Sequence, residues 1–177
     1  MNAILNRHDE AQWALIAQCL KTCTPKLQLS FIDYFGSFSQ IFEARESIDS
    51  PVLSQQLQIV RKDYHRGQWQ AEVEKISKSL EQHQAQIVPI TSGDYPPQLQ
   101  QIAKPPPLLY VRGNIHCLHL PQIAMVGSRR MTRGAEITAK SWAKSLAASG
   151  FTITSGMAIG IDSSAHKGAL EAPQGIS

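Results

Sequence analysis

The chain of 177 residues is poor in cysteine and has no long apolar run. Its three cysteines, Cys19, Cys23 and Cys117, leave one unpaired under any pairing, which favours free thiols in a reducing compartment. No segment approaches the ~20 consecutive apolar residues of a membrane-spanning helix. The N-terminus contains Asn2 and the polar run from Asn6 to Glu10, and it lacks the apolar core of a signal peptide. These absences exclude a disulfide framework and a membrane span, and we expect a cytoplasmic protein with no membrane partner.

Acidic residues are scarce in the second part of the chain. Residues 104–177 contain 8 lysines and arginines but only 3 aspartates and glutamates, a net charge of +5. Residues 1–103 contain 9 and 11 respectively, a net charge of −2. A basic segment favours a polyanionic partner, although a solvated basic face would have the same composition.

Apolar residues recur at helical spacing in the first part of the chain. Trp69, Val73, Ile76 and Leu80 form one stripe, which predicts a helix that ends near His83. Two further stripes comprise Trp13, Ile16, Ala17 and Leu20, and then Leu27, Phe31, Ile32 and Phe35 before the break at Gly36. The sequence therefore predicts a small helical domain over residues 1–85, whose aromatic side chains pack in a core rather than stack on bases.

Prolines separate this helical part from the rest. Prolines in the runs Gly93–Pro97 and Lys104–Pro107 have no backbone N–H to donate and hold the chain extended. We therefore expect a connector over residues 86–119 that no regular helix crosses. Within it, Leu108–Val111 has the pattern of a short strand, and Arg112–Asn114 has that of a turn.

A strand, a turn and a helix are then predicted twice. Ile123–Val126 is the first strand, and a helix runs from about Arg133 to Ser149, where Gly150 ends it. The second strand is Phe151–Thr154. Strand, helix and strand with these loop lengths form a right-handed βαβ unit with parallel strands. The fold class is therefore α/β, with the first half of a Rossmann-like parallel sheet over residues 120–177.

Glycine turns follow both of these strands. Glycine lets the backbone bend tightly and bring its N–H groups to a ligand, and the helix N-terminus behind it favours a phosphate. The arginine in the first turn adds a planar fork of donors for phosphate oxygens. Because ligands of parallel sheets bind beyond the carboxyl ends of the strands, we expect both turns to form one site. The spacing matches neither the dinucleotide fingerprint nor the Walker motif, so NAD or ATP is not expected and no cofactor is predicted.

Three motifs occur in order along the second half. They are Asp-Tyr-Pro-Pro-Gln-Leu at 94–99, Pro-Pro-Leu-Leu-Tyr-Val-Arg-Gly at 106–113, and Gly-Ser-Arg at 127–129 followed by Ser-Gly-Met-Ala-Ile-Gly-Ile-Asp-Ser-Ser-Ala-His-Lys-Gly-Ala-Leu at 155–170. Together they resemble the DNA-processing protein A family, DprA, also called Smf. The resemblance is strong over residues 94–170 and weak over the helical part, which is similar to the sterile-alpha-motif (SAM)-like domain of that family.

This resemblance implies a protein that is not an enzyme, binds single-stranded DNA, loads the RecA recombinase on it and supports natural transformation. A positive groove that follows the phosphates needs no catalytic residue. Arg129 would hold a phosphate together with the N–H groups of the first turn, and the second turn would approach the same strand. The residues predicted to bind DNA are Gly127, Ser128, Arg129, Arg130, Gly156, Gly160 and Lys167, with no metal ligand among them.

Several polar residues nearby have a structural explanation that is as good or better. We expect Asp162 to be the N-cap of a helix that starts at Ser163. Arg130 and Arg133 fit a solvated role equally well, and His166 fits a hydrogen bond to a neighbouring loop. A metal site is not predicted from His116, Cys117 and His119, which no fourth ligand follows at zinc-finger spacing.

The chain departs from the family pattern at three places. Met131–Gly134 stands where Pro-Tyr-Gly is common, and Thr22–Pro25 lacks the glycines of a helix-hairpin-helix, so we expect no DNA binding by the first domain alone. The sequence stops at Ser177, where a third parallel strand would begin. We therefore expect a truncated product with an open apolar edge, a missing dimer surface, weak or absent DNA binding and a tendency to aggregate.

Two other function classes remain as alternatives. A nucleotide-processing enzyme of the phosphoribohydrolase superfamily would need a Pro-Gly-Gly-x-Gly-Thr loop, which the sequence does not contain. The other alternative is an interaction module in which the helical domain recruits a protein and the basic domain is passive.

Overall fold

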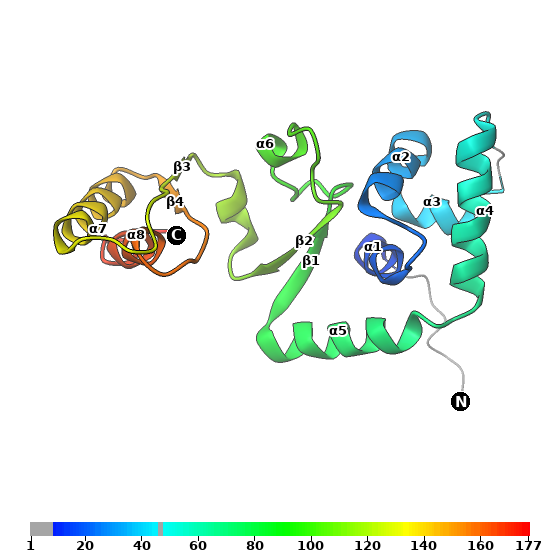
Figure 1. The fold of residues 1–177 in the computed structure, drawn as a ribbon, viewed down its shortest axis with the longest axis horizontal. Coiled ribbons are helices and arrows are strands. Elements are labelled where there is room, and N and C mark those ends of the chain that lie inside the picture. Colours follow the sequence, from blue (N-terminus) through cyan, green and yellow to red (C-terminus); the bar gives the residue numbers. More distant parts are fainter. Residues whose placement is uncertain (1–8, 46–47) are drawn as a thin grey trace. The chain divides into compact units, whose positions relative to one another are not determined.

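Residues 9–45 and 48–177 are described by the computed structural model (Figure 1). They divide into two units, a helical unit that ends at Ile115 and a βαβ unit, His116–Ser177. The α/β fold class is confirmed. The polar residues at positions 2–8, on which part of the cytoplasmic expectation rests, lie outside the described residues.

Five helices open the helical unit, and their starts follow from the sequence. They are α1 (Glu10–Cys19), α2 (Pro25–Phe35), α3 (Phe38–Glu43), α4 (Pro51–His65) and α5 (Gln70–His83). The first four are N-capped by side-chain oxygens of Asp9, Thr24, Ser37 and Ser50. Each oxygen accepts a backbone N–H that would otherwise lack a partner. Gly36, with φ +80°, ends α2 as expected, and the predicted helix end near His83 is confirmed.

An antiparallel hairpin follows these helices. Strand β1 (Ala85–Pro89) pairs with β2 (Leu108–Arg112), and between them lies the one-turn helix α6 (Pro97–Gln100). The strand at Leu108–Val111 is confirmed, whereas the expectation that no regular helix crosses residues 93–107 is wrong at α6. Proline suits that place because the first turn of a helix needs no N–H and its φ is already helical.

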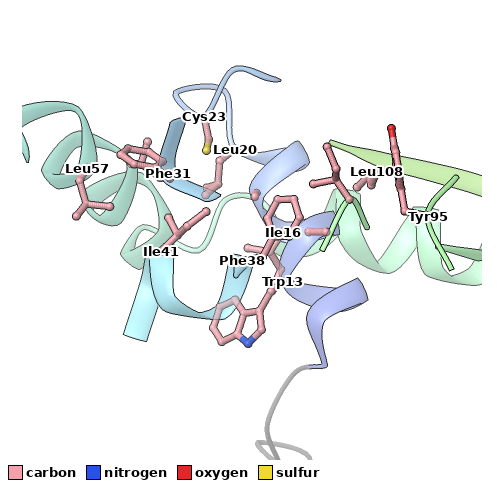
Figure 2. Close-up of a cluster of buried hydrophobic side chains, with 14 of the residues drawn as sticks. Trp13, Ile16, Leu20, Cys23, Phe31, Phe38, Ile41, Leu57, Tyr95 and Leu108 are labelled. Carbon is pink, nitrogen blue, oxygen red and sulfur yellow. The ribbon is translucent and has the colours of Figure 1, made fainter. Parts of the chain in front are cut away.

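The core of the helical unit explains why the hairpin belongs to it. Val88, Ile90, Tyr95 and Leu108, all from the stretch expected to be a connector, are buried in one cluster with side chains of the helices. Figure 2 shows part of this cluster, in which α1, α2, α3, α4 and the hairpin all contribute. The chain therefore divides after Ile115 rather than at residues 85 and 119, because apolar side chains beyond β1 are buried against the helices.

The βαβ unit is built as the sequence predicts. After a 3₁₀ helix at the junction (η1, Ile115–His119) come β3 (Gln122–Ala124), α7 (Arg133–Ala148), β4 (Thr152–Thr154) and α8 (Ile161–Leu170). The two strands are parallel, with Ile123 opposite Ile153, so the predicted βαβ unit is confirmed. The N–H of Ile153 also donates to the carbonyl of Ile176 (3.0 Å), so the segment after α8 lies beside β4 where a third strand was expected.

Candidate functional site

The first glycine turn lies between β3 and α7. The Ser128 hydroxyl accepts the N–H of Arg130 and donates to its carbonyl, both at 3.0 Å, which folds residues 128–130 into a tight local turn. Thr132 then caps α7 by accepting the N–H of Ala135 (3.2 Å). No hydrogen bond found within residues 9–45 and 48–177 uses the N–H groups of Gly127, Ser128 or Arg129. The Ser128 hydroxyl is thus engaged locally, while backbone donors of the turn stay available.

The second glycine turn lies between β4 and α8. Ser155 donates its hydroxyl hydrogen to the carbonyl of Met125 (2.7 Å), which attaches the start of this turn to the end of β3. At its far end the hydroxyl of Ser163 donates to the carbonyl of Ala158 (2.7 Å). Gly160 has φ +96° and ψ −134°, a conformation that essentially only glycine adopts without strain.

The two turns touch each other directly. The N–H of Ile161 donates to the carbonyl of Ser128 (3.2 Å). A Cβ atom on Gly160 would lie only 2.3 Å from that same oxygen and 2.8 Å from Cα of Arg129. A Cβ atom on Gly127 would lie 2.6 Å from Cγ1 of Ile161. Gly127 and Gly160 are therefore needed for close approach. The structure brings Ser128, Arg129 and Gly160 into contact, bonds Arg130 to Ser128, and places Gly127 beside Ile161 and Gly156 beside Asp162.

The charged side chains on these turns are exposed and unpaired. Arg129 and Arg130 are both exposed, and neither makes an ion pair with any other described residue. The carboxylate of Asp162, after the second turn, is buried. Glu136, the nearest acidic residue along the chain, lies in the first turn of α7 and forms no ion pair with either arginine. An exposed arginine pair without a paired carboxylate produces a positive potential that attracts an anion.

Lys167 and His166 lie farther along α8. Lys167 is exposed, and at 1.5 Å per residue it lies about 9 Å along the helix axis from Ile161. The structure therefore does not bring Lys167 into the two turns. The Nδ1 atom of His166 hydrogen-bonds the hydroxyl of Ser177, which agrees with the interpretation of this histidine as a partner for a neighbouring segment.

The expectation that Asp162 caps a helix starting at Ser163 is wrong. Helix α8 begins two residues earlier, at Ile161, with Gly160 as its N-cap. Asp162 lies in the first helical turn, and its Oδ2 atom accepts the N–H of Ala158 (3.4 Å) from the preceding loop. The carboxylate thus still satisfies a backbone donor near the positive end of the helix, two residues inside the cap position we expected.

Sequence reasoning missed three residues that shape the site. Ser155 ties the second turn to β3, Ile161 fills the space beside Gly127, and Thr132 caps α7. Ser155 and Ile161 lie inside the motif at 155–170, and Thr132 lies shortly after the motif at 127–129, so their position was available as a signal. The contacts that these residues make across the two turns depend on how two segments distant in the sequence pack together. A sequence pattern does not contain this information.

Two other features bear on function. Among the described residues, no group of three or more histidines, cysteines, aspartates and glutamates could hold a metal ion. No helix in the same part of the chain has the length and apolar character to cross a bilayer.

The turn between α1 and α2 is where a helix-hairpin-helix would bind phosphate. Here side chains at this turn form hydrogen bonds within the helical unit. Thr22 donates to Asp63 (2.9 Å), and the buried amide of Gln28 donates to the carbonyl of Cys23 (2.8 Å).

Comparison with known proteins places this arrangement in a family. The family model described as DNA recombination-mediator protein A matches residues 86–176. Protein Smf from Escherichia coli K12 is 45% identical over 92 residues, which cover 52% of this chain and 25% of that protein. Protein Smf from Synechocystis is 37% identical over 98 residues, which cover 51% of this chain and 25% of that protein.

A solved structure extends the likeness to the fold of most of the chain. DNA processing protein A from Streptococcus pneumoniae matches with a TM-score of 0.60 and 23% identity, over 90% of this chain and 52% of that one. At this identity the likeness supports the fold alone. The chain spans about a quarter of the length of the two Smf relatives.

Proposed function

The chain belongs to the DNA recombination-mediator protein A family, and from this premise we propose that it binds single-stranded DNA through its two glycine turns. We define this phosphate surface as residues 126–132 and 155–160. The observation that carries the proposal is the direct contact of Gly160 with the backbone of Ser128 and Arg129. It makes one continuous surface of two segments that each combine free backbone donors with a following helix N-terminus.

Arg129 is the residue that we assign to phosphate recognition. Its guanidinium is exposed and free of ion pairs among the described residues, and the N–H groups of Gly127 and Ser128 beside it have no acceptor there. A guanidinium fork and two N–H groups can share the oxygens of one phosphate. Arg130 adds positive charge, and Lys167 acts at longer range from α8.

We infer a binding role rather than a catalytic one. The carboxylate of Asp162 is buried and bonded to the N–H of Ala158, and a Cβ atom on Gly156 would lie 3.0 Å from its Oδ2. It is thus placed to hold the shape of the second turn, not to transfer a proton to a ligand above it. In this proposal the protein works in the cytoplasm, where it delivers bound single strands to the RecA recombinase during natural transformation.

The direct test is fluorescence anisotropy of a labelled single-stranded oligonucleotide, titrated with the full chain at several salt concentrations. Removal of one phosphate contact from a single strand lowers the slope of log affinity against log salt by about 0.7. Arg129→Ala is expected to lower the slope by about this amount and to weaken binding to all sequences alike. Lys144→Ala is the matched control, because it removes one positive charge from the exposed side of α7 and is expected to leave the slope unchanged.

Other outcomes would contradict the proposal in different ways. An Arg129→Ala variant with the wild-type salt slope would remove this residue from the surface. Duplex DNA bound as well as the single strand would argue against strand selectivity. Tighter binding of a labelled mononucleotide than of the oligonucleotide would favour the nucleotide-processing alternative.

A further inference from the structure

The two glycine turns also carry the most exposed large apolar side chains in the described part of the chain. Among the large apolar residues that the structure describes, the three with the highest exposed fractions are Val126 (85%), Met157 (82%) and Ile159 (73%). All three lie on the phosphate surface defined above. Exposed apolar side chains are ordinary when scattered singly, but a concentration on two touching turns indicates a site of interaction.

The backbone at Met157 supports the same interpretation. Its φ is +60°, in the left-handed region that glycine or asparagine adopts far more readily than methionine. A residue held in a sparsely populated conformation, with its side chain in solvent, is typical of functional turns rather than of packing. The second turn thus holds a flexible, polarisable side chain outward at a cost in backbone energy.

These apolar side chains alternate along the chain with the groups assigned to phosphate. Val126 directly precedes Gly127, and Ile159 directly precedes Gly160, whose Cα packs against Ser128 and Arg129. The surface therefore suits a partner that is anionic and also presents apolar groups at short intervals. A single-stranded polynucleotide has both, whereas a duplex keeps the faces of its bases stacked inside.

We propose that Val126, Met157 and Ile159 contact the unpaired bases of a bound strand. The inference rests on the proposed function and deepens it: the phosphate surface recognises bases as well as phosphates, without regard to sequence. Arginine and backbone donors supply the salt-dependent part of the affinity, and the apolar side chains supply the preference for unpaired bases.

The test compares two labelled oligonucleotides of equal length and charge, oligothymidylate and an abasic strand, titrated with the full chain. The wild-type chain is expected to bind oligothymidylate about fivefold more tightly, in line with the contact of a methionine sulfur and of apolar side chains with the face of a base. The double variant Met157→Asn, Ile159→Ser is expected to bind both strands equally and to keep the wild-type salt slope. Asparagine tolerates the left-handed conformation, so this change removes the apolar surface without adding strain.

Two control variants accompany the double variant. Met157→Leu with Ile159→Leu keeps the apolar surface and is expected to keep the preference for oligothymidylate. Ile137→Gln removes an exposed apolar side chain from α7, outside the turns, and is expected to change nothing.

The results of this experiment distinguish a failure of the base contact from a failure of the proposed function. Equal, salt-dependent binding of both strands by the wild-type chain would overturn the base contact and leave the phosphate site intact. An equal loss of affinity for both strands in the double variant would assign the apolar side chains to the shape of the turn, which also overturns it. Absence of binding to either strand, with binding to vesicles of anionic lipid, would overturn both proposals.

Discussion

The hydrophobic cores of the two units are built from different kinds of side chain. The core of the helical unit is built from large side chains, among which Phe31, Phe38 and Ile41 are fully buried. The core of the βαβ unit consists mainly of alanines from α7, α8 and the segment after α8, with Ile153 as its one large fully buried side chain among the described residues. One unit therefore depends on buried volume, and the other depends on close approach of backbones.

Glycine shows how close that approach is. A Cβ atom on Gly168 of α8 would lie 2.2 Å from the carbonyl oxygen of Lys140 on α7. Figure 1 shows these two helices side by side. The βαβ unit thus has little buried apolar area to spare, yet it leaves Val126, Met157 and Ile159 exposed on its turns. Helices α7 and α8 also expose Ile137, Trp142 and Leu170, but the three side chains on the turns have higher exposed fractions. A binding surface explains this exposure on the turns more easily than folding does.

The largest effect is expected from a cavity in the helical unit. Phe38→Ala removes a ring that is 0% exposed and is expected to lower the free energy of unfolding by about 3–5 kcal/mol. Amide hydrogen exchange resolved by peptide is the appropriate measurement, because it reports on the helical unit and the βαβ unit separately. Val52→Ala, at a side chain that is 71% exposed on α4, is the control and is expected to have little effect. Similar losses of stability in both variants would show that buried volume does not dominate the stability of this unit.

The opposite change should disturb the βαβ unit. Gly168→Ala adds one methyl group against the carbonyl of Lys140, which forces α7 and α8 apart, and we expect it to cost about 1–3 kcal/mol. Exchange protection of α7 and α8 measures the loss.

The matched control is the same substitution in the partner helix. Gly134→Ala, in the first turn of α7, places a Cβ atom no closer than 4.0 Å to another group. Alanine lowers the entropy of the unfolded chain and favours the helix, so this variant is expected to gain about 0.5–1 kcal/mol. If both variants lost stability, or both gained it, close approach of the two helix backbones would not be what determines the stability of the βαβ unit.

The same contrast explains what the sequence could predict. Helix ends followed from apolar stripes and from the glycines Gly36 and Gly150, and the βαβ unit followed from apolar runs separated by glycine turns. Strand β1 was missed because Ala85–Pro89 is short and becomes a strand only by pairing with β2, some twenty residues later. The start of α8 was misplaced by two residues because Gly160 is held by its contact with the first turn, which no local pattern encodes.

The sequence also located the glycine turns but not their complete surface. Glycine after a strand is a local signal that located both turns, and the family resemblance then assigned Gly127 and Gly160 to the site. The exposure of Met157 and Ile159 could not be predicted, because apolar residues are normally expected to be buried. Their burial depends on which other segments pack over them.

The smallest expected effect concerns a polar connection in the helical unit. The Glu10 carboxylate accepts the N–H groups of Phe38 (2.9 Å) and Ser39 (3.0 Å) at the start of α3, and the hydroxyl of Thr91 after β1 (3.2 Å). Burial by itself would raise the pKa of Glu10, but these hydrogen bonds outweigh it and hold the pKa below its ordinary value. The charged carboxylate thus joins α1, α3 and the hairpin.

Glu10→Gln is expected to lower the free energy of unfolding by about 1 kcal/mol at neutral pH. Because the pKa is lowered in the folded state, the contribution of Glu10 is fully present above the pKa of the unfolded chain, near 4.3. It is lost as the pH falls through the folded pKa, so the difference between wild type and variant should vanish in acid. Denaturant titrations across this range measure it, with Glu74→Gln as the control for an exposed carboxylate paired with Lys78. Added salt should screen the contribution of Glu74 but leave that of Glu10, since backbone N–H groups rather than a mobile cation hold it. A difference at Glu10 that salt abolishes, or that persists in acid, would mean that buried hydrogen bonds do not hold the hairpin to the helices.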